Sequence, residues 1–162
     1  MSTLKVGTIQ DHTNSNTAMS IDSTGRVTTP ARPSFKASPT GSGNAGATAD
    51  IVFGDVTTAT RGCHNIGGHY STSTGKFTAP VTGVYVFHFC TGQYSNNVSI
   101  IKFYLNTNPC GTMIQNTGDS SDTLEASQNL YLTAGDYVHM KITGGYYEYG
   151  TDSSFFSGYL LG

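Results

Sequence analysis

Side chains that could do chemistry are few, and they are spread thinly along the 162 residues. Cys63, His64 and His69 stand close enough together to suggest a zinc site, but their spacing matches no recurrent zinc motif and the pattern offers no fourth ligand. The segments that mark serine hydrolases, P-loop nucleotide sites and zinc proteases do not occur. A carboxylate pair for glycoside hydrolysis remains the enzymatic alternative. Because only ten residues are acidic and none stands beside an obvious base, we expect no enzyme.

The three cysteines are odd in number and lack the Cys-x-x-Cys spacing. We interpret Cys63, Cys90 and Cys110 as free thiols of a chain folded in a reducing compartment, and a single intrachain bridge as the alternative.

One acidic loop could bind a hard cation. Asp119, Asp122 and Glu125 lie in a stretch rich in Gly and Ser, and their oxygens are ligands that Ca²⁺ accepts. Their spacing is not that of an EF-hand, so a solvated acidic loop between two strands is the alternative. Apart from this possible calcium site, we expect no cofactor.

Three tyrosines form the clearest candidate for ligand contact. Tyr146, Tyr147 and Tyr149 fall between glycines in residues 144–150, and exposed tyrosine next to glycine is common where proteins recognise sugars or other proteins. The alternative is a strand edge or a subunit interface.

Composition narrows the class of partner. Charged residues make up 11% of the chain and the net charge is −2, which gives no electrostatic case for nucleic acid. No apolar run approaches the roughly 18 residues that cross a bilayer, so we expect no membrane insertion. Residues 1–10 lack the apolar stretch of a secretory signal, which predicts that the chain is not exported.

The elements that must position these side chains are strands. Apolar and polar residues alternate with period two in residues 83–89, 99–105 and 136–142, and Gly, Asn, Ser and Pro interrupt the pattern, which indicates an all-β protein with many turns. Gly135 and Asp136 predict a hairpin turn. Helical periodicity does not extend beyond about two turns anywhere.

The last strand, residues 154–161, is apolar on both faces. Phe155, Tyr159 and Leu161 alternate with Phe156 and Leu160. An antiparallel strand buried on both faces needs two covers. One is the opposite sheet and the other is a neighbouring subunit, so these residues predict an oligomer.

Residues 1–32 differ from the rest. Three short alternating segments, separated by turn formers, carry too few apolar residues to bury themselves, and Pro30 and Pro33 mark a boundary after them. We predict an N-terminal arm or stalk over 1–32 that docks on a partner, and a head over 33–162. A frayed leader is the alternative.

Residues 65–89 carry a spaced pattern that resembles the signature of the complement C1q globular-head domain. Matching positions are Asn65, Tyr70, Phe77, Gly83, Tyr85, Phe87 and Phe89. Residues 130–138 and 154–161 resemble two further blocks of that family, whereas Ala59 stands where the signature has Phe, and the loop 54–64 looks longer than usual. The resemblance implies a ten-strand jelly-roll sandwich, similar to the tumour-necrosis-factor group, that forms homotrimers. Core and trimer packing would then rest on Tyr70, Phe77, Tyr85, Phe87, Phe89, Phe155, Phe156, Tyr159 and Leu161.

Residues 8–11 and 18–27 resemble, more loosely, short segments of bacteriophage tail and fibre proteins. Together the two resemblances predict a trimeric virion surface protein: a small fibre, fibre tip or capsid knob for host attachment or particle decoration. Its partners would be other virion proteins, through residues 1–32, and a host surface glycan or protein. The alternatives are a secreted C1q-like recognition protein of a cellular organism and a phage depolymerase.

Overall fold

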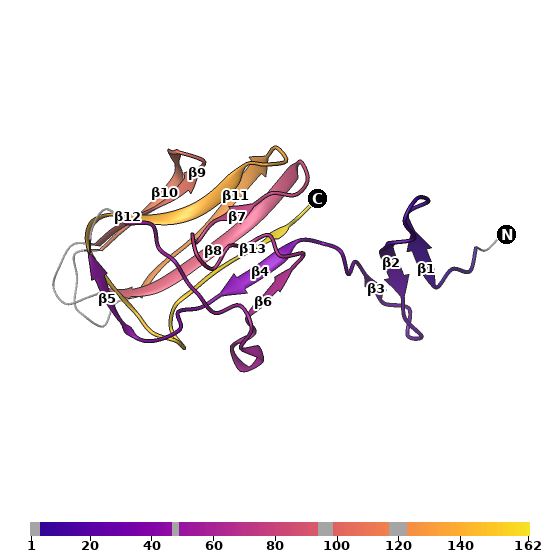
Figure 1. Ribbon diagram of the computed structural model, residues 1–162, viewed down its shortest axis with the longest axis horizontal. Helices are drawn as coiled ribbons and strands as arrows, with labels where there is room; N and C mark the ends of the chain where they lie inside the picture. The colour runs from indigo at the N-terminus through magenta and orange to yellow at the C-terminus, as the bar shows by residue number, and fades with distance from the viewer. Residues whose placement is uncertain (1–3, 47–48, 94–98, 117–122) are drawn as a thin grey trace. The chain divides into compact units, whose positions relative to one another are not determined.

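The computed structural model describes residues 4–46, 49–93, 99–116 and 123–162. Within them the chain forms thirteen strands and a single 3-10 turn, Ala59–Arg61. It divides into two compact units, Met1–Arg32 and Pro33–Gly162, both of which are drawn in Figure 1.

The N-terminal unit is a small antiparallel sheet of β1 (Thr8–Gln10), β2 (Thr17–Ile21) and β3 (Val27–Thr28). Asp11 shapes its first turn by accepting hydrogen bonds from the backbone N–H groups of residues 13, 14 and 16. Asp22 shapes the second, where its carboxylate also meets the Arg26 guanidinium at 2.6 Å. None of the described residues 4–32 is buried. The unit is therefore held by its turns and ladders and not by a core.

The head contains the ten strands β4 to β13, arranged as a jelly-roll sandwich, which confirms the predicted fold class and strand number. One layer has the order β11-β8-β13-β4-β6, and Figure 1 shows β11 and β13 on either side of β8. Its strands are β4 (Ser34–Ala37), β6 (His64–Ile66), β8 (Gly83–Gln93), β11 (Thr123–Leu132) and β13 (Phe155–Leu160).

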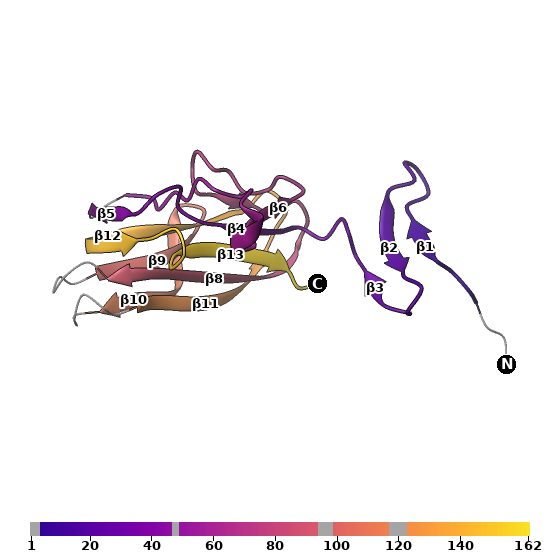
Figure 2. The same cartoon turned by 90° about the horizontal axis from the view of Figure 1, so that it is seen from below.

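The other layer is built on the long strand β12 (Tyr137–Tyr149), with β9 (Ser99–Leu105) and then β10 (Asn108–Asn116) along one edge. β12 also pairs with the short strands β5 (Gly43–Gly46) and β7 (Phe77–Thr78). Near its end β12 also pairs with β8, so one continuous run of hydrogen bonds joins the layers. Figure 2 gives the perpendicular view.

Period-two alternation explains the core. Tyr85, Phe87 and Phe89 of β8 are at most 1% exposed, because every second side chain of this strand points between the layers. Phe35 packs on Tyr70 and Phe77 with ring centroids 4.7 and 5.0 Å apart. Each fully buried aromatic side chain contributes about 2–3 kcal/mol of burial free energy, so this cluster dominates the stability of the head.

The predicted hairpin at Gly135 and Asp136 is wrong. β11 pairs with β8, whereas β12 pairs with β9, so the turn after Leu132 joins strands of different layers and not neighbours in one sheet. Gly135 adopts a φ of 95°, which favours glycine whichever connection the turn makes.

Candidate recognition site

The aromatic residues of the C1q-like pattern lie inside the head. Tyr70, Phe77 and Phe156 are at most 3% exposed, as are Tyr85, Phe87 and Phe89. The Tyr70 hydroxyl donates to the carbonyl of Phe53 at 3.1 Å and accepts from the N–H of the same residue at 3.2 Å. Burial raises the pKa of Tyr70 to about 12. These side chains hold the sandwich together and are not placed to touch a ligand.

The outward side of β8, β11 and β13 carries a second apolar group. Tyr159 is 40% exposed and Leu161 51%, whereas Phe155 is half-buried. Tyr159 lies opposite Val86 in the ladder, and Tyr131, at 68% exposure, lies opposite Val84. We call this surface the outer apolar face; its members are Val84, Val86, Tyr131, Tyr159 and Leu161.

Further along the same side the surface becomes polar. A cavity of about 370 Å³ is lined by His88, Ser127, Glu125 and Phe155 among others. The Ser127 hydroxyl meets His88 Nδ1 at 2.6 Å, but Glu125 lies opposite Cys90 in the ladder and does not orient the histidine. Burial first, and then the Glu125 charge, raises the pKa of the Cys90 thiol, which keeps it protonated. Neither Ser127 beside His88 nor Cys90 beside Glu125 is therefore an activated nucleophile.

The predicted calcium ligands can be placed only in part. Glu125 is exposed at the start of β11. Asp119 and Asp122 lie outside the described residues.

Strand alternation separates the three candidate tyrosines. Tyr146 is 47% exposed, whereas Tyr147 is only 5% exposed and packs in the core, with its ring centroid 5.7 Å from that of Tyr149. Burial raises the pKa of Tyr147 to about 12. The three side chains therefore do not form one exposed surface. Tyr146 stands on the outward side, Tyr147 is part of the core, and Tyr149 is half-buried.

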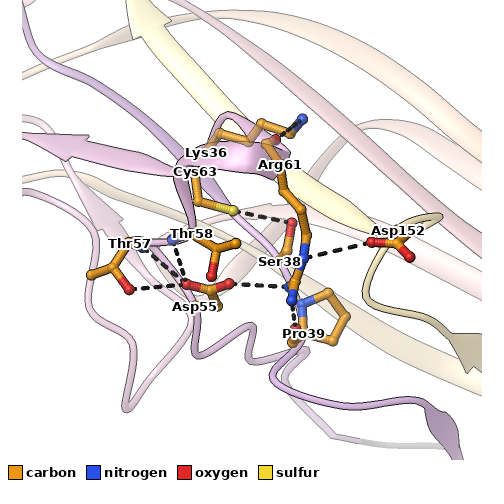
Figure 3. A network of polar contacts seen from close by, with 9 residues as sticks. All are labelled: Lys36, Ser38, Pro39, Asp55, Thr57, Thr58, Arg61, Cys63 and Asp152. Carbon is orange, nitrogen blue, oxygen red and sulfur yellow. Dashed lines mark hydrogen bonds and ion pairs between the residues drawn. The ribbon is translucent and has the colours of Figure 1, made fainter.

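The loop before β6 holds a polar network that the sequence pattern did not predict. Figure 3 shows the Arg61 side chain between two carboxylates, Asp55 at 3.1 Å and Asp152 at 3.6 Å. Arg61 Nη1 also donates to the Pro39 carbonyl, and the Arg61 carbonyl accepts from Lys36 Nζ at 2.8 Å. The network ties this loop to β4 and to the segment before β13.

Asp55 is the buried member of this network, at 9% exposure. Hydrogen bonds from the Thr58 side chain and from the Thr57 backbone lower the pKa of Asp55 to about 2, although burial opposes them. The signal in the sequence is Asp followed two and three residues later by Thr, a pattern in which a carboxylate accepts from nearby backbone N–H groups. The arrangement stabilises a loop that also lines a cavity of about 210 Å³.

The zinc candidate residues turn to separate partners. The Cys63 thiol donates to the Ser38 hydroxyl, His64 Nδ1 meets the Gly62 carbonyl, and the His69 ring packs against Phe77. Across the described part of the chain, no three histidine, cysteine or acidic side chains converge as a metal site would need. The described residues also contain no helix that is long and apolar enough to cross a membrane.

The head is similar in sequence to domains of known proteins. Residues 35–161 match the C1q domain. Human complement C1q and tumor necrosis factor-related protein 9B is 35% identical over 104 residues, covering 57% of this chain and 29% of the human protein. Mouse complement C1q tumor necrosis factor-related protein 2 is 34% identical over 103 residues, covering 60% and 34%. The chain thus spans about a third or less of these relatives.

Solved structures show the same fold. The globular domain of zebrafish complement 1qA superposes with a TM-score of 0.60 at 20% identity, covering 80% of this chain and 98% of that one. Eiger TNF from S. frugiperda superposes with a TM-score of 0.55 at 17% identity, covering 81% and 92%.

These matches correct one prediction and confirm another. The expected location on a virion surface is wrong, because the curated relatives are human and mouse C1q and tumor necrosis factor-related proteins. The expectation that the chain is not an enzyme is confirmed, because C1q/TNF-like domains recognise and signal and do not catalyse. With more than half of its residues matched, this chain belongs to the C1q domain family.

Proposed function

We propose that the head assembles as a homotrimer and acts as the recognition module of a secreted C1q-like protein of a cellular organism. Domains of the C1q/TNF type form homotrimers. The observation that carries the proposal for this chain is the outer apolar face, which leaves Tyr131, Tyr159 and Leu161 between 40 and 68% exposed.

The position of that face supports burial against other copies. Val84 and Val86 lie at the centre of it, between Tyr131 on one neighbouring strand and Tyr159 on the other. Neighbouring apolar side chains on one face of a sheet favour association, because burial removes their surface from water with a gain of roughly 25 cal/mol per Å². Around a three-fold axis each copy contributes the same strands, so one side chain contributes to the interface three times.

Light scattering tests the assembly. The purified chain should have a mass of about three times 17.1 kDa. Tyr159→Glu should release monomers, because it places three carboxylates in a closed apolar interface, where unpaired charge is strongly unfavourable. Val52→Glu is the matched control: Val52 is 42% exposed, and it follows Ile51, whose N–H bonds to Met140 in the other layer.

Two results of the light-scattering experiment would contradict the proposed trimer. A wild-type chain that runs as a clean monomer at micromolar concentration contradicts the trimer. Equal loss of assembly in both variants would also contradict it, because the effect would then not be specific to the outer apolar face.

A trimer binds a ligand that is repeated on a surface more tightly than a single head does. After one head of the trimer has bound, the second and third binding events are intramolecular, so modest affinity at each head becomes strong binding overall.

The N-terminal unit fits this proposal as an arm that extends the head or docks it on a partner. Most of its apolar residues are exposed, with Leu4 at 87% and Val27 at 56%, and no described residue of the unit is buried. A unit without a core gains stability when those side chains pack against another chain. Three copies of the arm in a trimer would supply such packing.

A further inference from the structure

Another cavity opens on the outward side of β12, in the layer that does not carry the outer apolar face. It measures about 240 Å³. Its lining includes the charged and aromatic side chains of Asp50, Lys76, Tyr104, Tyr137, His139 and Lys141. The cavity is below the roughly 300–1,000 Å³ of a drug-sized pocket, which suits a ligand about as large as one sugar residue.

His139 forms the floor of this cavity. Alternation along β12 points it away from the core, yet it is only 6% exposed. The rings of Tyr104, opposite on β9, and of Tyr137 flank the imidazole, with centroids 5.4 and 5.8 Å away. An imidazole buried in this way is positioned by its neighbours.

One ring nitrogen of His139 has a fixed role. Nε2 lies 3.2 Å from the carbonyl oxygen of Asn106, and a carbonyl can only accept, so Nε2 carries the hydrogen. That carbonyl is itself held in place, because the Asn106 side chain donates to Asp136 and accepts from the N–H of Tyr137. In the neutral ring, Nδ1 therefore keeps a lone pair.

Nδ1 lies 3.2 Å from Asp50 Oδ1, within the range of an ion pair, but the geometry gives Nδ1 no hydrogen bond. Burial lowers the pKa of His139, and the charges of Lys76 and Lys141 act in the same direction, against Asp50 and the Asn106 carbonyl. The ring is then neutral near pH 7. Two acceptors, Nδ1 and the carboxylate, face one cavity, and a buried acceptor without a donor is unfavourable. The pair is complementary to a hydroxyl group.

The rim of the cavity carries cationic hydrogen-bond donors, whereas Nδ1 and the Asp50 carboxylate are acceptors. Lys76 Nζ stands 4.4 Å from the centroid of the Tyr137 ring, and Lys141 Nζ stands 5.7 Å from that of Tyr104. These contacts hold two ammonium groups beside the cavity. Two ammonium groups against the single Asp50 carboxylate leave a charge of +1 when His139 is neutral, which favours an anionic ligand.

We propose that this cavity binds a sugar residue that carries an acidic group. Its hydroxyls donate to His139 Nδ1 and Asp50, its acidic group meets Lys76 and Lys141, and its ring lies against Tyr104 and Tyr137. The inference rests on the proposed recognition function. The site stays open in the trimer, because β9 and β12 belong to the layer away from the outer apolar face.

A printed array of neutral, sialylated, uronic-acid-containing and sulfated oligosaccharides tests the proposal with the full chain. Acidic members should bind and their neutral counterparts should not. Asp50→Asn should weaken that binding at least ten-fold, because the new amide can donate to Nδ1 and fills the acceptor that the sugar needs. Lys141→Gln should weaken it by a similar factor.

Two charge-matched controls should bind as the wild type does: Asp152→Asn, at a side chain 90% exposed, and Lys5→Gln in the N-terminal unit. Melting temperatures of all variants show that each is folded. Equal binding of neutral and acidic glycans, or unchanged binding in Asp50→Asn, overturns the inference. If light scattering of the same sample shows a trimer that binds no member of the array, this inference fails while the proposed assembly stands.

Discussion

At the scale of single residues, Asp55 joins the two ends of the loop before β6, because it accepts from the N–H groups of Thr57 and Thr58 and pairs with Arg61. Asp55→Asn keeps the shape but removes the charge that pairs with Arg61 at 3.1 Å. Breaking a partly buried, hydrogen-bonded ion pair is unfavourable, so we expect the free energy of unfolding to fall by about 2 kcal/mol. Urea unfolding at pH 7 measures this change.

The pH dependence of Asp55→Asn follows from the depressed pKa of the aspartate. The folded pKa is about 2, against an ordinary value of 3.8. The unfolded chain therefore binds the proton first, and the stabilisation by Asp55 is present above about pH 4 and disappears as the pH falls to about 2. The difference between wild type and variant should narrow across that window. Asp152→Asn, at the exposed end of the network, should change little, and a constant difference down to pH 2 would refute this account.

At the scale of one element, β13 depends on a glycine that faces the core. A Cβ at Gly158 would lie 2.5 Å from Phe87 Cδ1 and 3.0 Å from Phe35 Cε1, closer than packed carbons tolerate. Gly158→Ala should therefore overpack the core and lower the free energy of unfolding by about 1–3 kcal/mol. Thermal unfolding measures the change.

Gly41→Ala provides the comparison for Gly158→Ala, because a Cβ at Gly41 meets nothing within 4 Å. Its melting temperature should stay within a degree or two of the wild type. Similar losses in both variants would show that general backbone stiffening, and not crowding beside Phe87, causes the effect.

At the scale of the whole molecule, the two units differ in what holds them. The head has its own core, whereas Met1–Arg32 has no buried residue among those described. Deleting residues 1–32 should leave the melting temperature of the head nearly unchanged, because the core of the head consists of its own side chains. Calorimetry of the truncated and full-length chains compares them. A head that fails to fold without the arm would show that the units depend on each other.

The sequence by itself determined the features that follow from local periodicity. Alternation identified Tyr85, Phe87 and Phe89 as one face of a strand, and the spaced C1q-like pattern identified the family and the ten-strand head. It also found the apolar outward side of the last strand, at Tyr159 and Leu161. These properties can be predicted from the sequence because side-chain direction in a regular strand depends only on the parity of the position.

Tertiary structure decided what depends on which strands meet. His139 has the parity of an outward residue and is nevertheless buried, because Tyr104 of β9 covers it. Tyr147 belongs to the core although Val138, Met140 and Ile142 place the core on the other parity of β12, because the register of this strand shifts between Ile142 and Gly144. The turn at Gly135 joins two layers. The parity of a position tells on which face of a strand the side chain lies, but not which other strands pack against that face. The ion pair of Arg61 with Asp55 and the cavity beside His139 arise from contacts between distant segments, which local patterns do not encode.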